Sequence, residues 1–202
     1  MVVNCIYNIN QPSLVYFLMD ITTLIKEAKH GSTAAQKALF DMFADKMLLL
    51  CCRYVKRRED AEELLLDGFY KFFKNIQSFS YQGEAAMYSW LKRIMINECL
   101  MFLRKKNVFT IVTESAAEEI VLEEEALNNL SADEIFNLIV TLPVGYRTVF
   151  NLFVVEGMEH KEIAVLMGIS EGTSKSQLSK ARVLLQKKKK KKGIAYVKQK
   201  AQ

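Results

Sequence analysis

Hydrophobic residues recur every three or four positions over most of the chain after residue 20, which predicts helices rather than strands. The pattern starts at Ile21 and is interrupted at Gly31. Three longer helices are predicted next, at about Thr33–Tyr54, Asp60–Phe73 and Ala85–Lys105. A polar loop, Asn75–Gly83, separates the last two. The apolar positions of each helix gather on one face, so these helices are expected to share a core.

The helical period is absent from two other stretches. Residues 1–18 lack it, and we interpret them as a disordered or non-native extension, with Met19 as the natural start. Residues 107–130 form an acidic bridge, after which Ser131 and Glu134 make the pattern of a capping box. A further helix is predicted over Val144–Val155, and two short helices and a run of lysines follow.

Composition supports a folded helical protein. Only 2 of the 202 residues are proline and 8 are glycine, few for an architecture of strands and turns. Half of the residues are hydrophobic and a quarter are charged, which excludes a wholly disordered chain. No apolar run reaches the roughly 18–20 residues that cross a bilayer, and no basic residue precedes Lys26 as in a signal peptide. The 4 cysteines lack the spacing of a zinc site or a disulfide framework, so we expect a cytoplasmic protein.

The net charge of +5 conceals an uneven distribution. Residues 1–106 carry a net charge of +4, residues 107–146 carry −8, and residues 147–202 carry +9. Two basic blocks on either side of an acidic one suggest two surfaces for a polyanion. A solvated acidic linker followed by a basic tail would give the same distribution.

The segment Glu159–Leu185 has the pattern of a helix-turn-helix. A short helix ends before Gly168, which suits a left-handed turn, and Ser170 can cap the next helix. That second helix turns Ser174 and three apolar residues inward, and its other face offers groups for base edges and phosphates: Thr173, Lys175, Ser176, Gln177, Ser179, Lys180 and Arg182. The alternative is an ordinary helical hairpin with a solvated polar face. Ser174 is the weak point, because an apolar residue there would pack better.

These motifs resemble those of bacterial RNA polymerase sigma factors, particularly the small extracytoplasmic-function (ECF) group. LPVGYRTVFNLFVVEGMEHKEIAVLMGISEGTSKSQLSKAR (Leu142–Arg182) resembles the family's fourth conserved region. DAEELLLDGF (Asp60–Phe69) and WLKRIMINECLMFLRKK (Trp90–Lys106) resemble parts of its second region. The resemblance implies an all-α fold of two small helical domains. These are a four-helix region 2 over 19–106 and a helix-turn-helix region 4 over 131–187, joined by the acidic linker 107–130 and followed by a basic tail, 188–202.

Three positions depart from the family pattern. The family usually has Gln where Leu66 stands, often a hydrophobic residue at Gly68, and often an acidic residue at Met101. These departures put details of the polymerase-facing surface in doubt.

The resemblance implies a partner for each region. Core polymerase would bind the acidic start of the third helix, through Asp60, Glu62, Glu63 and Asp67, although acids at a helix start are also favoured by the helix dipole alone. The minus-ten element would be opened by aromatic and cationic residues, for which the candidates are Tyr81, Tyr88, Lys92, Arg93, Asn97, Arg104 and Lys105. Trp90 is more simply explained as a core residue.

The minus-thirty-five element would be bound as duplex by the second helix of the helix-turn-helix. Thr173, Ser176, Gln177 and Lys180 are the candidates for base edges, and Lys175, Ser179, Arg182 and Arg147 for phosphates. By analogy with the family, the acidic linker would run near the active centre of the polymerase. The lysine run from Lys187 would either extend the DNA footprint or form a disordered, solubilising tail.

We therefore expect a sigma factor that binds core RNA polymerase and promoter DNA. An anti-sigma factor is a plausible further partner, and no membrane insertion is expected. The alternative is a helix-turn-helix regulator that does not act as a polymerase subunit, but it leaves the Asp60–Lys106 motifs unexplained. An enzyme is less favoured, because neither His30 nor His160 has a catalytic or zinc-binding neighbour in sequence. No metal site and no cofactor are expected.

Overall fold

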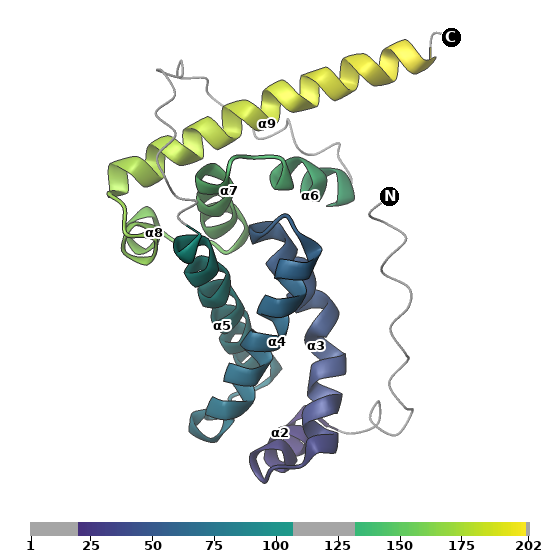
Figure 1. Cartoon of the computed structure of the whole chain (residues 1–202), viewed down its shortest axis with the longest axis vertical. Coiled ribbons are helices and arrows are strands. Elements are labelled where there is room, and N and C mark those ends of the chain that lie inside the picture. The colour runs from purple at the N-terminus through teal and green to yellow at the C-terminus, as the bar shows by residue number, and fades with distance from the viewer. Residues whose placement is uncertain (1–19, 107–131, 201–202) are drawn as a thin grey trace. The chain divides into compact units, whose positions relative to one another are not determined.

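The computed structural model describes residues 20–106 and 132–200, and every regular element within these ranges is a helix (Figure 1). The predicted all-α class is therefore confirmed. The elements are α2 (Ile21–Lys29), α3 (Thr33–Tyr54), α4 (Arg58–Asn75), η2 (Ile76–Ser78), α5 (Glu84–Lys105), α6 (Ala132–Val140), α7 (Val144–Phe150), η4 (Asn151–Val155), α8 (His160–Met167) and α9 (Glu171–Lys200). Three predictions concern residues outside these ranges: the extension 1–18, the acidic linker 107–130 and the capping residue Ser131.

The chain divides into two compact units that alternate along the sequence. Of the described residues, the first contains 20–51 and 62–98, and the second contains 52–61, 99–106 and 132–200. The helices α3, α4 and α5 thus contribute residues to both units. The domain boundary predicted at residue 106 does not coincide with this division, and the domain limits stay a prediction.

Aromatic side chains from α3, α4 and α5 pack against one another in the first unit. The rings of Phe40 and Phe69 lie 4.7 Å apart, and those of Phe72 and Trp90 lie 4.9 Å apart. Phe79, in the segment after η2, stacks on Trp90 with the ring planes 3° apart. Each such pair adds about 1 kcal/mol to the gain from burial. Trp90 therefore packs among other rings, as the sequence favoured.

Gly68 lets α4 and α5 approach closely. A Cβ atom at this position would lie 2.2 Å from the Sδ atom of Met95, a residue of α5 that is fully buried. The Met95 side chain thus occupies the space that a larger residue at 68 would need. This contact explains the departure from the hydrophobic residue expected there.

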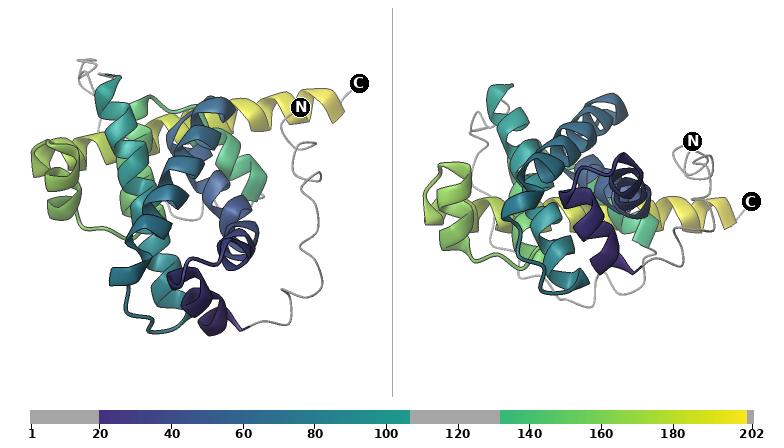
Figure 2. Two further views of the ribbon diagram at one scale, coloured as in Figure 1. Left: turned by 60° about the horizontal axis from the view of Figure 1, so that its bottom comes forward. Right: turned by 90° about the horizontal axis from the view of Figure 1, so that it is seen from below.

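The helix α2 lies beside η2, at the end of the first unit where the polar loop connects α4 to α5 (Figure 2). The Nζ atom of Lys29 donates to the carbonyl of Phe79 at 2.6 Å, and the side-chain amide of Gln77 donates to the carbonyl of Lys29. The predicted loop is therefore joined through Gln77 and Phe79 to the end of α2. Gly31 marks the break after α2, with a φ of 85°.

In the second unit, α7 and α8 both pack on α9. The helix predicted over Val144–Val155 is present, but its last turn, η4, widens into a π-helical turn. The second helix of the helix-turn-helix, α9, does not stop near residue 187 but continues through the lysine run to Lys200. Lysine is a good helix former and no proline interrupts this segment. Among the helices of the described ranges, none has the length and apolarity required to cross a membrane.

Candidate nucleic-acid interface

The turn between α8 and α9 has the predicted geometry. Gly168 adopts the left-handed conformation, with φ 69° and ψ 36°, and its neighbour Ile169 donates its backbone N–H to Ala164. Ser170 caps α9, since its Oγ accepts the backbone N–H of Thr173 at 3.0 Å. Glu159, with Glu162, forms a capping box at the start of α8. The helix-turn-helix predicted from the sequence is therefore present.

The outward face of α9 carries most of the predicted DNA contacts. Lys175, Ser176 and Ser179 are exposed, and Thr173, Lys180 and Arg182 are half-buried. The Lys175 ammonium lies 2.6 Å from a carboxylate oxygen of Glu171, one turn before it, and this pairing lowers the pKa of Glu171. A phosphate that binds Lys175 would therefore compete with an exposed carboxylate.

Gln177 does not share this face, although the sequence placed it there. Its side-chain amide packs against α7 beside Gly145, where an added Cβ would lie 3.2 Å from Oε1. That oxygen is buried, and the described residues supply no hydrogen-bond donor to it. Gln177 lies on the edge of α9 that faces α7, so its amide cannot reach a base edge without moving.

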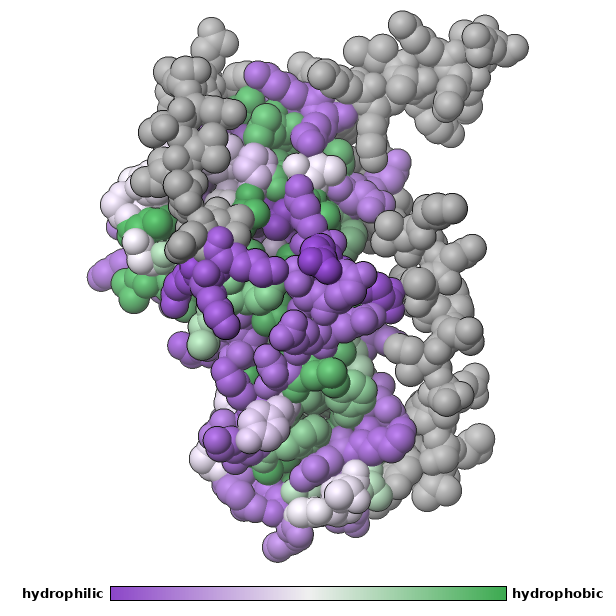
Figure 3. Space-filling view, in the orientation of Figure 1, coloured by the Kyte–Doolittle hydropathy of each residue, from purple (hydrophilic) through white to green (hydrophobic). Residues whose placement is uncertain are grey.

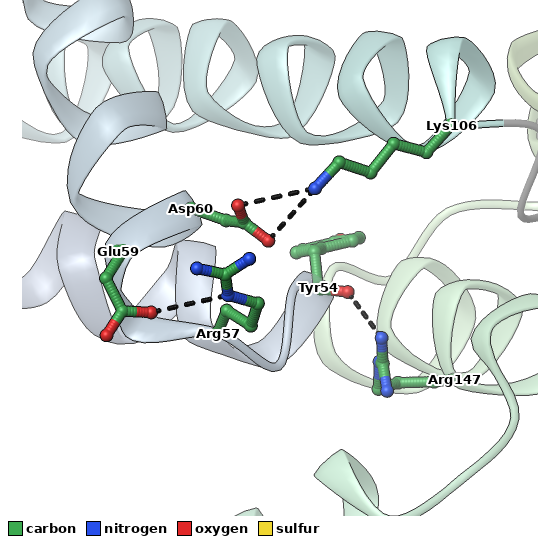
Figure 4. A network of polar contacts seen from close by, with 6 residues as sticks. All are labelled: Tyr54, Arg57, Glu59, Asp60, Lys106 and Arg147. Atoms are coloured by element: carbon green, nitrogen blue, oxygen red, sulfur yellow. Dashed lines mark hydrogen bonds and ion pairs between the residues drawn. The ribbon is translucent and has the colours of Figure 1, made fainter.

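Arg147 is also placed differently from its prediction as a phosphate contact. The side chain is only 1 % exposed, and burial lowers its pKa to about 10, so it stays protonated at neutral pH. Its guanidinium donates to the carbonyls of Val140, Leu142 and Tyr54, the last at 2.7 Å (Figure 4). Arg147 in this arrangement holds backbone and is not available to DNA.

The carbonyl of Tyr54 belongs to the last turn of α3, where carbonyls have no partner within the helix. Asn151 supplies a second donor there, since its side-chain amide lies 2.9 Å from the carbonyl of Arg53. The Arg53 guanidinium in turn pairs with Glu156 at 3.1 Å. Side chains of α7 and η4 thus cap the carboxyl end of α3.

Ser174 is fully buried, and the structure supplies the reason for a polar residue at this position. Its Oγ lies 2.9 Å from Nδ1 of His160, the first residue of α8. The imidazole also stacks on Phe153, with the rings 4.4 Å apart and 19° from parallel. From the sequence alone, His160 is an ordinary polar residue near a helix end. The only signal for this pair was the polar residue at an inward position of α9.

The minus-ten candidates lie on α5 and on the segment before it. Arg93 and Asn97 are exposed and one turn apart, and Arg104 and Lys105 are exposed at the end of the helix. The other candidates are half-buried: Tyr81, Tyr88 and Lys92. The ring of Tyr88 lies 6.3 Å from that of Phe43, and Arg104 donates to the carbonyl of Leu166.

The predicted docking residues of α4 are mostly exposed. Glu62, Glu63 and Asp67 are exposed, and the half-buried Asp60 pairs with Lys106 at 3.3 Å (Figure 4). Two large apolar side chains of α4 are also exposed, Leu66 by 61 % and Tyr70 by 65 %. Figure 3 shows hydrophobic groups among hydrophilic ones over α3 and α4. The surface of α4 thus combines acids with apolar groups.

Within residues 20–106 and 132–200, no group of three or more His, Cys, Asp or Glu side chains is arranged to hold a metal ion.

Comparison with protein families gives two matches in sequence order. The family model for Sigma-70 region 2 matches residues 39–108, and that for Sigma-70, region 4 matches residues 125–185. Together they span most of the chain and contain the helices that carry the candidate residues.

Individual proteins are similar over nearly their whole length. The chain is 28 % identical over 184 residues to the ECF RNA polymerase sigma-E factor of Haemophilus influenzae, covering 82 % of this chain and 93 % of the relative. It is 27 % identical over 182 residues to the ECF RNA polymerase sigma factor SigW of Bacillus subtilis, covering 84 % and 96 %.

Two solved structures are also similar. One is CnrH in complex with the cytosolic domain of CnrY, at 18 % identity and a TM-score of 0.44, covering 82 % of this chain and 95 % of that one. The other is the sigma factor RpoE in complex with the anti-sigma factor NepR from Bartonella quintana, at 22 % identity and a TM-score of 0.45, covering 75 % and 94 %.

Proposed function

The chain belongs to the sigma-70 family of RNA polymerase sigma factors, in its ECF group, and we propose how its helices divide the work of promoter recognition. As a sigma factor it binds core RNA polymerase and directs promoter recognition and the initiation of transcription. Its partners are thus core polymerase and promoter DNA. What remains to be assigned is the residues that make each contact.

The helix α9 reads the minus-thirty-five element in the major groove of duplex DNA. The observation that carries this assignment is the exposed face of α9, presented by a capped turn and combining hydroxyl groups with cations. Ser176 and Thr173 lie near the start of the helix, where recognition helices contact base edges. Lys175, Ser179 and Arg182 hold phosphates, and Lys180 contributes to either kind of contact. Gln177 has a lesser part in this scheme than its sequence position indicated.

The helix α5 and the segment before it hold the minus-ten element. Opened DNA strands need cations for the backbone and flat side chains for unstacked bases. Arg93 and Asn97 provide an exposed polar pair on one turn of α5. Tyr81 and Tyr88 offer rings on the amino-terminal side, and Lys92, Arg104 and Lys105 add positive charge.

The helix α4 docks on core polymerase. Its exposed acids Glu62, Glu63 and Asp67 would steer the approach of a basic surface, and the exposed apolar residues Leu66 and Tyr70 would be buried on contact. Asp60 contributes less directly, because it is paired with Lys106. The contact is thus part electrostatic and part hydrophobic.

The remaining assignments follow from membership in the family. Sigma factors are transcription initiation factors, and we infer that this chain performs no catalysis of its own and needs no cofactor. Because it acts with RNA polymerase, it works in the cytoplasm. The acidic linker runs through the polymerase near its active centre. The lysine run that begins at Lys187 strengthens binding to DNA. An anti-sigma factor regulates the protein.

Run-off transcription with purified core polymerase tests the proposal. Promoter-dependent transcripts are expected only when the full chain is added to core enzyme. A helix-turn-helix regulator that is not a polymerase subunit would bind the same DNA but give no transcript with core enzyme. DNA recovered from cells with the protein would supply the promoter sequence for this assay.

A further inference from the structure

The bond between His160 and Ser174 joins the two helices of the helix-turn-helix at a buried point. Ser174 lies in the first turns of α9, and the other inward residues of that face are apolar: Leu178, Ala181 and Leu185. A buried hydroxyl without a partner is costly, so the 2.9 Å contact with Nδ1 of His160 is the interaction that makes serine acceptable here.

The position of the imidazole is itself restricted. The stacked ring of Phe153 covers one of its faces, and the capping box of Glu159 and Glu162 determines where α8 begins. Residues of η4, α8 and α9 therefore meet at His160. A histidine held in this way can act as a fixed reference point for the serine.

Ser174 stands between residues that the proposed function assigns to DNA. Thr173 and Lys175 flank it, and Ser176 follows two positions later. Successive residues of a helix are about 100° apart around its axis, so the direction in which Ser174 points determines the directions of its neighbours. Hydrogen bonds to base edges weaken steeply with misalignment, so a small rotation of α9 changes discrimination between sequences.

The hydrogen bond between His160 and Ser174 can orient α9, which apolar packing at this position would not do. Apolar contacts are non-directional, whereas a hydrogen bond specifies both a distance and an angle. Replacement of both partners by apolar groups of similar shape is close to neutral for stability. The pair is therefore better explained by the orientation of α9 than by its contribution to folding.

We propose that His160 is a positioning residue for DNA recognition: through its bond to Ser174 it sets the rotation of α9, and so contributes to sequence discrimination without contacting DNA. This inference rests on the proposed role of α9 in reading the minus-thirty-five element. It extends the set of residues that determine specificity to a fully buried serine and its half-buried histidine partner.

The experiment uses holoenzyme assembled from core polymerase and the full chain. The probe is a promoter duplex selected from a random library by the wild-type holoenzyme, and the competitor is the same duplex with its minus-thirty-five part scrambled. The discrimination ratio is the affinity for the probe divided by that for the competitor. Ser174→Ala and His160→Phe are each expected to lower this ratio about two- to tenfold, the equivalent of one hydrogen bond.

Two further variants separate positioning from folding. The double variant Ser174→Ala with His160→Phe replaces the pair by apolar groups, and it should have no lower ratio than either single variant, because both act through one bond. His160→Asn, whose amide can replace Nδ1, should keep the ratio within about twofold of wild type. His30→Phe, at the other, exposed histidine, is the matched control and should change nothing.

Unchanged ratios in both single variants, with Ser176→Ala lowering the ratio, would overturn this inference and leave the proposed function intact. A ratio that falls only in proportion to a loss of thermal stability would also overturn it. If substitutions at Ser176 and Lys175 leave binding to the probe unchanged as well, α9 does not read this element, and the proposed function fails together with the inference.

Discussion

The guanidinium of Arg147 donates a hydrogen bond of 2.7 Å to the backbone carbonyl of Tyr54, 93 positions earlier in the chain. The same guanidinium serves the carbonyls of Val140 and Leu142, so one side chain satisfies acceptors from two distant segments. An arginine that sequence analysis assigned to phosphate binding is therefore part of the protein interior.

Replacement of Arg147 should destabilise the protein. We expect Arg147→Met to lower the free energy of unfolding by about 3 kcal/mol, because buried carbonyls lose their donor. Arg147→Lys should rescue little of this loss, since an ammonium lacks the planar set of donors that reaches several acceptors. Urea unfolding followed by circular dichroism measures the effect.

The exposed Arg93 provides the control for this measurement. Arg93→Met should change the free energy of unfolding by less than about 0.5 kcal/mol. Equal stability of the two methionine variants would contradict the structural role of Arg147.

The contact between Gly68 and Met95 predicts that Gly68→Ala destabilises the wild-type protein but stabilises a variant that lacks the Met95 side chain. Gly68→Ala alone should lower the free energy of unfolding by about 1 kcal/mol, because the buried Met95 side chain must move out of a filled core. In a Met95→Ala background the same substitution should instead stabilise by about 1 kcal/mol, through better helix propensity and a smaller cavity. Thermal unfolding of all four proteins gives the coupling energy, and additive effects would show that the two residues do not compete for space.

The histidine of the α8–α9 pair should make stability depend on pH. The folded protein lowers the pKa of His160, first through burial and then through Lys175, with a smaller effect of Arg182 and an opposing one of Glu171. The unfolded chain has the ordinary pKa of about 6.5 and so takes up its proton at a higher pH than the folded protein does. The stability that neutral His160 contributes is therefore complete above about pH 6.5 and is lost as the pH falls toward the folded-state value.

Melting temperatures of wild type and His160→Asn between pH 8 and pH 5 test this dependence. Below about pH 6.5, the melting temperature of wild type should fall relative to that of His160→Asn. Parallel curves over the whole range, or a shift in favour of wild type, would exclude the assigned effect of burial and of the nearby cations.

Phosphate and base contacts of α9 should respond differently to salt. Lys175→Gln and Arg182→Gln should each weaken binding to all promoters and reduce the slope of log affinity against log salt by about 0.9. Ser176→Ala should leave that slope unchanged and alter the preference among sequences. Filter binding of holoenzyme over a series of salt concentrations measures both quantities, and the same slope change in all three variants would refute the division.

Much of the fold could be predicted because it depends on local signals. The presence of most helices follows from the spacing of apolar residues, although this spacing did not predict the length of α9. The turn at Gly168 follows from a residue that tolerates positive φ, and the cap at Ser170 follows from its hydroxyl. Trp90, predicted as a core residue, is half-buried and stacks on Phe79.

Two polar residues, Arg147 and Gln177, lie in surroundings that the sequence did not indicate. Arg147 looked like a surface cation because its acceptors are backbone carbonyls, which leave no trace in the identity of the residues that carry them. Gln177 looked exposed because a helical wheel does not show that α7 covers one edge of α9.

The sequence by itself determined the family, the helical class and the face of α9 that is polar, because each depends on residues close together in the chain. Only the tertiary structure decided that Ser174 has a partner in His160 and that Arg147 is withdrawn from solvent. The physical reason is that a buried polar group is satisfied by whichever donor or acceptor the fold brings within about 3 Å, and chain packing alone determines that neighbour.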